Sequence, residues 1–278
     1  MTRMLAVCAD DFGLDRATSR TVAELAAAGR LQAVSCLTNL AAWRDCAPLL
    51  AGLPPDVARG LHFNLSEGTP LSEALRDAWP TPQPLARLLA AAALGRLPGG
   101  AIEAELDAQW SAFVHATGHA PDFVDGHQHV HALRGVRDAV LRRARAAGVP
   151  VRSTGHVLGP GYAFKRRVIE ACGGRALAQA LAAQGLVHNA ALVGVYDFGP
   201  RDYRALMRGW LAALRADRPG GVTLLFCHPG AAGDASAHDA IAAARRAEAA
   251  YLGSPAFVDD LAAAGVTATW PWRRSSGD

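Results

Sequence analysis

Short apolar runs alternate with longer helical patterns along almost the whole chain, and this alternation most constrains its fold. The predicted strands are Met4–Ala9, Ala33–Thr38, Val57–Leu65, Asp122–Val130, Val149–Arg152, Leu192–Val195, Gly221–Cys227 and Val266–Trp270. The predicted helices are Arg16–Ala28, Ala41–Leu50, Leu85–Leu97, Ile102–His115, Val136–Ala147, Phe164–Ala183, Tyr203–Ala216, Ala237–Leu252 and one that begins at Ser254-Pro255. Such alternation predicts a parallel sheet covered by helices. About seven or eight units indicate a (β/α) barrel, distorted or incomplete, with an open doubly wound sheet as the alternative.

Two segments between these elements carry turn signals. Glu67–Pro84 contains four prolines and is predicted to be a loop, and Gly173-Gly174 is expected to divide the helix at Phe164–Ala183. We find no internal repeat and no linker rich in Pro, Gly or Ser. Residues 1–278 are therefore expected to form a single catalytic domain.

Composition excludes several classes of protein. The chain is 51% hydrophobic with a net charge of +3, and no stretch concentrates basic residues, so nucleic acid is not an expected partner. Lys165 is the only lysine, which we ascribe to compositional drift towards arginine. No apolar tract reaches the ~20 residues of a membrane span, and the first apolar run is too short for a secretory signal. We expect a soluble cytoplasmic protein with five reduced core thiols, at Cys8, Cys36, Cys46, Cys172 and Cys227.

Polar residues follow several of the predicted strands, where reacting groups gather in parallel α/β folds. Asp10 and Asp11 end the first strand, and two adjacent carboxylates there favour a bound cation or a shared proton. The alternative is that Asp11 or Asp15 caps the next helix. His62 and Asn64 share one face of the third strand, although a buried histidine of the core would give the same pattern.

The segment Asp122–His131 carries the strongest signal in the sequence. If it stays extended, Asp125, His127, His129 and His131 share one face, and Gly126 allows close backbone approach. Scattered surface histidines are the alternative, but a file of them after an apolar strand favours metal binding or catalysis. Three protein ligands would leave one position open for water.

One further histidine, His228, ends the strand Gly221–Cys227, although a turn histidine without a role is the alternative. Cys227 lies on an apolar strand and is predicted to be a buried thiol. Carboxylates and histidines on separate strand ends suggest an Asp-His-His site, which suits Zn, Mn, Fe or Co and, by a softer argument, Mg. A second carboxylate could then accept a proton from water, and a histidine could protonate the leaving group. The remaining histidines, which show no pattern, are His115, His119, His156, His188 and His238.

The motifs together resemble those of YdjC-like carbohydrate deacetylases, a group that includes chito-oligosaccharide deacetylases and hopanoid-associated deacetylases. The matching motifs are Ala-Asp-Asp-Phe-Gly (9–13), Gly-Leu-His-Phe-Asn-Leu (60–65), Asp-Gly-His-Gln-His-Val-His (125–131) and Cys-His-Pro-Gly (227–230). Weaker matches are Asn39, Arg245-x-x-Glu248 and Leu252-x-Ser254. The resemblance runs in order from about residue 4 to residue 270, but residues 154–199 match nothing that we can place.

This resemblance implies a barrel of the polysaccharide-deacetylase kind and a set of residue roles. Asp11, His62 and His127 would hold one divalent metal ion, Mg by resemblance, with Zn, Mn or Co as alternatives. Asp10 would be the general base and His228 the general acid in hydrolysis of an N-acetyl group from an amino sugar. Residues that would support a ligand or face the substrate are Asp125, His129, His131, Asn64, Asn39 and Arg245.

The substrate implied is an N-acetylglucosamine-type sugar, either a chito-oligosaccharide or a lipid-linked, hopanoid-type glycan. A barrel metallo-hydrolase of another class, a phosphoesterase or an amidohydrolase, is the alternative, and a phosphate substrate would favour basic residues such as Arg134, Arg152 or Lys165 near the site. A sugar-binding or scaffold protein with a degenerate site is a third reading, which the intact ligand set disfavours. The sequence leaves open whether the chain forms a homodimer.

Overall fold

The computed structural model describes residues 3–199, 202–214, 221–231 and 239–272. Its sheet is parallel throughout, in the order β4-β3-β2-β1-β6-β5, with β7 paired to the start of β1. The strands are β1 (Arg3–Phe12), β2 (Ala33–Cys36), β3 (Ala58–Phe63), β4 (Val124–Gly126), β5 (Ala191–Val193), β6 (Val222–Cys227) and β7 (Val266–Ala268).

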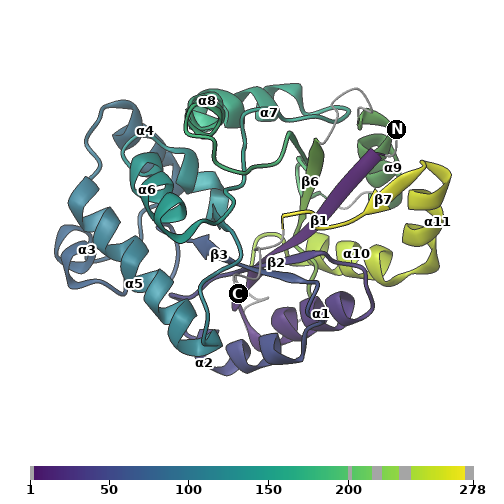
Figure 1. Cartoon of the computed structure of the whole chain (residues 1–278), viewed down its shortest axis with the longest axis horizontal. Coiled ribbons are helices and arrows are strands. Elements are labelled where there is room, and N and C mark those ends of the chain that lie inside the picture. The colour runs from purple at the N-terminus through teal and green to yellow at the C-terminus, as the bar shows by residue number, and fades with distance from the viewer. Residues whose placement is uncertain (1–2, 200–201, 215–220, 232–238, 273–278) are drawn as a thin grey trace.

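In a closed barrel of six strands, each strand would pair with the next one around a ring. Strands β1 to β6 follow this order, but the ring is open because β4 does not pair with β5. Two single bridges lie in the interruption, where Val151 pairs with Val124 and Val157 pairs with Leu192. The strand predicted at Val149–Arg152 is thus reduced to one bridging residue. The predicted (β/α) barrel, distorted and incompletely closed, is confirmed (Figure 1).

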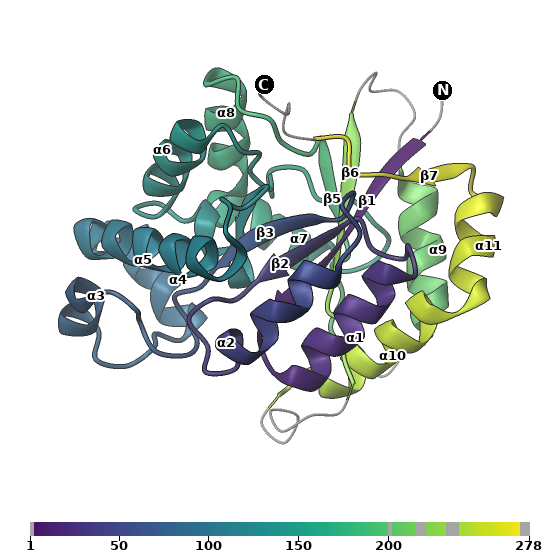
Figure 2. The same cartoon turned by 60° about the horizontal axis from the view of Figure 1, so that its bottom comes forward.

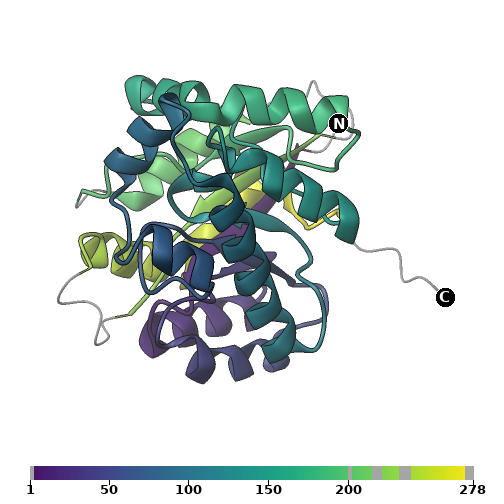
Figure 3. The same ribbon diagram turned by 90° about the vertical axis from the view of Figure 1, so that its left-hand side faces the viewer.

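Helices surround the strands on the outside, with α1 and α2 on one side and α7 and α8 on the opposite side (Figures 1 and 3). Figure 2 shows α9, α10 and α11 packed against one another, with α10 beside α1. The helices are α1 (Arg16–Ala27), α2 (Trp43–Cys46), α3 (Glu73–Ala78), α4 (Leu85–Ala93), α5 (Gly99–Thr117), α6 (Arg137–Ala147), α7 (Ala163–Ile169), α8 (Arg175–Ala183), α9 (Tyr203–Ala213), α10 (Ala242–Gly253) and α11 (Pro255–Ala263). Three irregular helices are η1 (Ala47–Gly52), η2 (His127–Ala132) and the π-helix η3 (Glu170–Gly174).

Several predicted boundaries are wrong. The predicted loop Glu67–Pro84 contains α3, because the Ser72 hydroxyl caps a helix by accepting from the backbone N–H of Leu75. The helix predicted at Ala41–Leu50 is a short α2 followed by the 3₁₀-helix η1. The predicted break in Phe164–Ala183 is confirmed, because η3 separates α7 from α8 and Gly173 has a φ of 131°. Residues 215–216 and 237–238 of two predicted helices lie outside the described residues.

The barrel interior changes from apolar to polar along each strand. Inward-facing positions alternate, so β1 presents Ala6 and Cys8 to a central cluster that also contains Phe226, and Trp270 lies against Phe123 in it. Gly60 is required on β3, because a Cβ there would lie 2.3 Å from the Phe123 ring. The next inward positions, at the C-terminal ends of the strands, are the predicted site residues Asp10, His62, Asp125 and His228.

Two other expectations concern the thiols and the membrane. Cys8, Cys36, Cys46 and Cys227 are buried and unpaired, but Cys172 is exposed on η3, so the prediction of a core thiol there is wrong. Among the described residues, no helix is long and apolar enough to cross a membrane.

Candidate active site

A cavity of about 690 Å³ opens at the C-terminal ends of the strands. Asp10, Asp11, His62, His127 and His228 all line it, although they come from four separate strand ends. The fold thus brings together the five residues to which the sequence assigned metal binding or catalysis.

A distortion of β1 lets two adjacent carboxylates face the same cavity. In a regular strand, Asp10 and Asp11 would point to opposite faces of the sheet. The pairing of β1 with β2 is irregular between Ala9 and Phe12, and Asp11 has a φ of 64°, in the left-handed region. This conformation costs about 1–3 kcal/mol in a residue other than glycine, which is typical of strain retained at a functional site. Asp15, not Asp11, caps α1 by accepting from the backbone N–H of Thr18.

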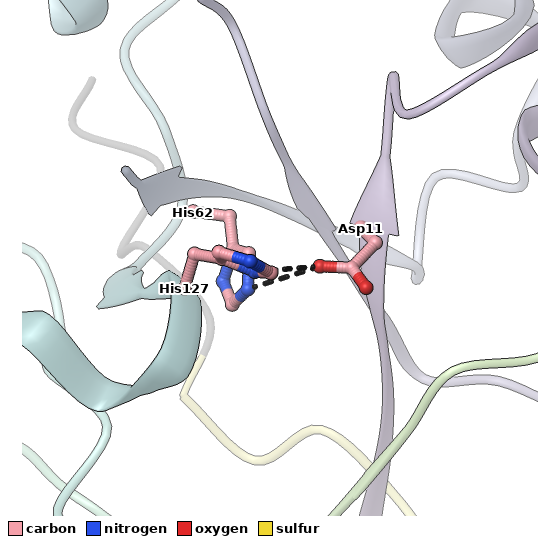
Figure 4. Close-up of side chains that lie close together, drawn as sticks. All are labelled: Asp11, His62 and His127. Atoms are coloured by element: carbon pink, nitrogen blue, oxygen red, sulfur yellow. Dashed lines mark hydrogen bonds and ion pairs between the residues drawn. The ribbon is translucent and has the colours of Figure 1, made fainter. Parts of the chain in front are cut away.

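Asp11, His62 and His127 form the tightest group of potential metal ligands in this cavity. Each offers one ligand atom, and these atoms lie within 4.8 Å of one another. Oδ1 of Asp11 lies 3.0 Å from Nδ1 of His127 and 3.5 Å from Nε2 of His62. Figure 4 shows the two rings and the carboxylate pointing toward one another from β3, the start of η2 and the end of β1.

The His62 ring is held from its far side. Its Nδ1 lies 2.6 Å from Oδ1 of Asp125, and the Ser35 hydroxyl donates to the same carboxylate oxygen at 2.6 Å. Asp125 is fully buried. Although burial opposes protonation, the carboxylates of Asp125 and Asp10 raise the pKa of His62 to about 10. The ring is therefore positioned to present Nε2 towards Asp11.

Arg152 connects Asp10 with Asp125 beneath the cavity. Its guanidinium donates to both oxygens of Asp10, at 2.7 and 2.6 Å, and lies 2.5 Å from Oδ2 of Asp125. Arg152 is 2% exposed, so this ion pair is shielded from water. Cys8, Asp10 and Asp125 also lie close enough to hold a cation, but Arg152 contacts all three and occupies that place. Because Arg152 is buried and paired with both carboxylates, it does not fill the place of a phosphate-binding residue that the phosphoesterase alternative would favour.

Arg245 holds the other oxygen of Asp11. Nη2 of Arg245 donates to Oδ2 of Asp11 at 2.7 Å, and its Nε donates to Asp239 at 2.7 Å. Although burial opposes ionisation, Arg245 and His127 hold the pKa of Asp11 well below its usual range. Asp11 is thus an ionised carboxylate with Oδ1 directed at the two imidazoles.

Glu67 is a residue that the sequence analysis missed. Its Oε1 lies 3.2 Å from Nε2 of His127, and it lines the cavity. The amide side chains of Asn39 and Asn64 bond to one another and both donate to the backbone carbonyl of Glu67. Asn39 and Asn64 therefore shape the loop that presents Glu67. The polar residue Asn64, just after β3, was the signal in the sequence that this loop belongs to the site. Glu67 itself belongs to no recognisable pattern.

The predicted file of histidines is wrong, because the extended run ends at Gly126. The 3₁₀-helix η2 begins at His127, and Gln128 and His129 adopt positive φ values of 52° and 62°. His129 still lines the cavity, whereas His131 turns away and its Nε2 contacts the backbone carbonyl of Arg152 at 2.9 Å. A Cβ on Gly126 would lie 2.9 Å from the His131 backbone nitrogen, so this close approach requires glycine.

His228 is anchored through its backbone. Its N–H donates to Oε2 of Glu248, while the Tyr196 hydroxyl donates to Oε1 of Glu248 at 2.5 Å. Glu248 is fully buried, and burial raises its pKa to about 7. Burial also lowers the pKa of His228 to about 4, despite the nearby carboxylates of Asp11 and Asp10. The His228 ring is thus neutral at pH 7.

The Asp11–His62–His127 group fits a divalent cation. Ligand atoms about 2.1 Å from a metal lie roughly 3–3.5 Å apart, as the measured separations do. One carboxylate and two imidazoles are ordinary ligands of Zn, Mn, Fe and Co. The support of His62 by a carboxylate on its other nitrogen is also typical of metal-ligating histidines.

Comparison with known proteins places the chain in a family. A family model described as YdjC-like protein matches residues 4–263. This chain belongs to the YdjC-like family. A mouse protein named carbohydrate deacetylase is 33% identical over 244 residues, which cover 81% of this chain and 77% of the mouse protein. A Klebsiella pneumoniae protein named chitooligosaccharide deacetylase is 36% identical over 159 residues, 55% of this chain and 60% of that one.

A solved structure supports the fold of this YdjC-like chain. It comes from an Enterococcus faecalis V583 protein whose name connects it with cellobiose-phosphate cleavage. The two chains align with a TM-score of 0.74 over 98% of each, at 18% sequence identity. At this identity the likeness concerns the fold alone.

Proposed function

We propose that this YdjC-like chain is a metal-dependent N-deacetylase that hydrolyses the acetamide of an N-acetylglucosamine-type sugar to acetate and a free amine. The observation that carries the proposal is the convergence of Asp11, His62 and His127 in one cavity with Asp10 and His228. The names of the mouse and Klebsiella relatives support the same reaction.

Asp11, His62 and His127 would hold the cation in this proposal. A divalent cation bound there would lower the pKa of a water molecule and polarise the acetamide carbonyl. Asp10 would accept a proton from the water, because its carboxylate lines the cavity and its Oδ2 retains a lone pair beside the hydrogen bond from Arg152, whereas Oδ1 accepts from both Arg152 and the Cys8 thiol. Arg152 would keep that carboxylate oriented.

His228 would protonate the leaving nitrogen of the sugar. Because its ring is neutral at pH 7, His228 must first gain a proton: we propose that Asp10 passes to His228 the proton it takes from the water, and that the resulting imidazolium gives this proton to the leaving nitrogen, which returns Asp10 to the carboxylate and His228 to the neutral ring. The contact of Glu248 with the His228 backbone would keep the ring at the cavity wall.

The nature of the cavity wall supports a lipid-linked amino sugar as the substrate over a chito-oligosaccharide. Apolar side chains make up much of the cavity wall, among them Leu85, Ile169, Val195, Phe198 and Phe226. A polar oligosaccharide would leave much of this surface without a partner, whereas an apolar group attached to the sugar would bury it.

The phosphoesterase alternative receives little support from the basic residues that motivated it. Arg152 is buried and paired with two carboxylates, and Arg134 lines a separate cavity beside α4 and η3. Of the three basic residues, Lys165 lines the site. A small amide of another kind remains the runner-up substrate.

Acetate release tests the proposal. Purified protein would be assayed on N,N′-diacetylchitobiose, glycolipids with an N-acetylglucosamine head group, p-nitrophenyl phosphate and simple acetamides, with and without chelator. We expect acetate from an amino sugar, lost with chelator and restored by added Mg, Mn, Zn or Co. Hydrolysis of the phosphate ester alone would overturn the proposal.

A further inference from the structure

The only lysine of the chain lies at the candidate active site. Of 28 Lys and Arg residues, Lys165 alone is lysine, and it lines the cavity that contains Asp11 and His228. It comes from α7, in the region that matched no motif. Lys165 is exposed as a whole residue, and its partly buried ammonium lies at the cavity wall.

The Lys165 ammonium is held in a defined place by the segment that follows β5. Nζ donates to the backbone carbonyl of Tyr196 at 2.7 Å and lies 4.7 Å from the centre of the Phe198 ring. The Tyr196 hydroxyl in turn bonds to Glu248, which accepts from the His228 backbone. Tyr196 therefore connects Lys165, through Glu248, with His228, the proposed general acid.

One aromatic ring separates Lys165 from His228. The Phe198 ring packs edge-on against the His228 ring at 5.2 Å between centroids, with the Lys165 ammonium beside it. Phe198 has a φ of 60°, a strained conformation for this residue type, which fixes the ring between the two. A pyranose ring is similar in size to a phenyl ring, so a sugar whose acetamide lies beside His228 reaches Lys165 with its hydroxyl groups.

We infer that Lys165 is a substrate-binding residue that donates hydrogen bonds from Nζ to hydroxyl oxygens of the amino sugar. An ammonium has three donors, and the Tyr196 carbonyl takes one of them. Four carboxylates line the same cavity, at Asp10, Asp11, Glu67 and Asp239, which favours a neutral sugar over an anionic group. Partial burial lowers the pKa of Lys165, against the effect of Asp197, so a larger fraction of the amine is unprotonated and can be labelled. This inference rests on the proposed function and names a contact to its substrate.

Selective labelling tests the contact independently of catalysis. The metal-loaded protein would be acylated briefly with an N-hydroxysuccinimide ester, with and without a glycolipid that carries an N-acetylglucosamine head group, and then digested for mass spectrometry. Because Lys165 is the only lysine, the amino terminus of the same molecules serves as the internal reference. We expect the sugar to slow modification of Lys165 severalfold and leave that of the amino terminus unchanged.

Kinetics of Lys165→Met provide the second readout. We expect kcat/KM to fall about 10-fold or more, mainly through KM, because a hydrogen bond from a charged donor is lost. Arg167→Met, on the same helix but outside the described lining of the cavity, is the control and should keep wild-type values. An active wild type with unprotected Lys165 and an unchanged KM in Lys165→Met would overturn this inference alone. A wild type that deacetylates no amino sugar would overturn the proposed function and the inference with it.

Discussion

Nδ1 of His62 lies 2.6 Å from Oδ1 of Asp125, while Nε2 of the same ring lies 3.5 Å from Oδ1 of Asp11. One imidazole therefore lies between two buried carboxylates, one on each nitrogen. This arrangement determines the tautomer that the ring adopts when a cation lies beside Asp11, because the proton must then stay on Nδ1.

Loss of either histidine of the group should remove the metal. We expect His62→Ala and His127→Ala to abolish acetate release and to lower the metal content measured by elemental analysis, because two ligands hold a cation far more weakly than three. His119→Ala, at an exposed histidine of the surface, is the matched control. Full activity in both site variants would refute the ligand assignment.

Asp125→Asn should weaken metal binding without removing a ligand. The amide cannot accept the Nδ1 proton of His62 as strongly as the carboxylate does, so affinity is expected to fall about 10–100-fold. Titration of the metal-free protein with the cation measures this change. Ser35→Ala removes the hydroxyl that donates to Asp125 and should have a smaller effect in the same direction. Equal affinity in Asp125→Asn and the wild type would contradict the positioning role.

Asp10→Asn should separate catalysis from metal binding. If Asp10 is the general base, the variant retains its metal, and kcat falls by about 10²–10⁴. Turnover and metal content are measured on the same preparation. Because Arg152 donates to both oxygens of Asp10, thermal unfolding should be compared as well, to show that any loss is not a loss of fold. Unchanged turnover would remove Asp10 from the mechanism.

Metal binding should strengthen as pH rises. In the metal-free protein the neighbouring carboxylates raise the pKa of His62 to about 10 and that of His127 to about 9, so both rings carry a proton at pH 7 that a cation must displace. The raised pKa values of His62 and His127 also stabilise the metal-free fold. This contribution to stability is complete below pH 6.5, the ordinary pKa of histidine, and is lost as the pH rises towards 9–10. Calorimetry in buffers of different ionisation enthalpy should detect proton release. Affinity that does not vary between pH 6 and 9 would count against this assignment.

Glu248 should make the fold less stable at alkaline pH. Burial raises its folded-state pKa to about 7 from an ordinary 4.5, so its contribution is complete below pH 4.5 and is lost as pH rises through 7. The loss is at most about 3 kcal/mol. Urea unfolding at pH 5.5 and pH 8 should show a smaller difference for Glu248→Gln than for the wild type. The exposed Glu24→Gln is the control, and an unaltered pH dependence in Glu248→Gln would refute the prediction.

Periodicity was enough to predict the barrel and the strand ends that line the cavity. Ala6, Cys8 and Asp10 occupy successive inward positions of β1. Reading every second residue therefore shows that the strand changes from apolar in the barrel interior to polar at its C-terminal end. The same rule failed at Asp11 and at His129. Both residues have positive φ values, which no alternating pattern reveals.

The carboxylate partners of Arg152 and Arg245 also escaped prediction, although Arg245 itself was among the residues expected to support a ligand or face the substrate. Arg152 is separated from Asp10 by 142 residues, and Arg245 from Asp11 by 234. Each arginine lies in a segment whose local pattern is that of an ordinary strand or helix. Their roles depend on which carboxylate each arginine reaches, and that is decided by the assembled barrel.

The sequence by itself determined the alternation of strands and helices and the residue types at the strand ends, because both depend on side chains near one another in the chain. Only the tertiary structure decided that Asp10 and Asp11 face one cavity, that His127 but not His131 joins His62, and that Lys165 lies one ring away from His228. These relationships depend on backbone distortions and on contacts between distant segments. Packing of the whole barrel supplies the free energy that stabilises these distortions and contacts. A local sequence pattern carries no information about that packing.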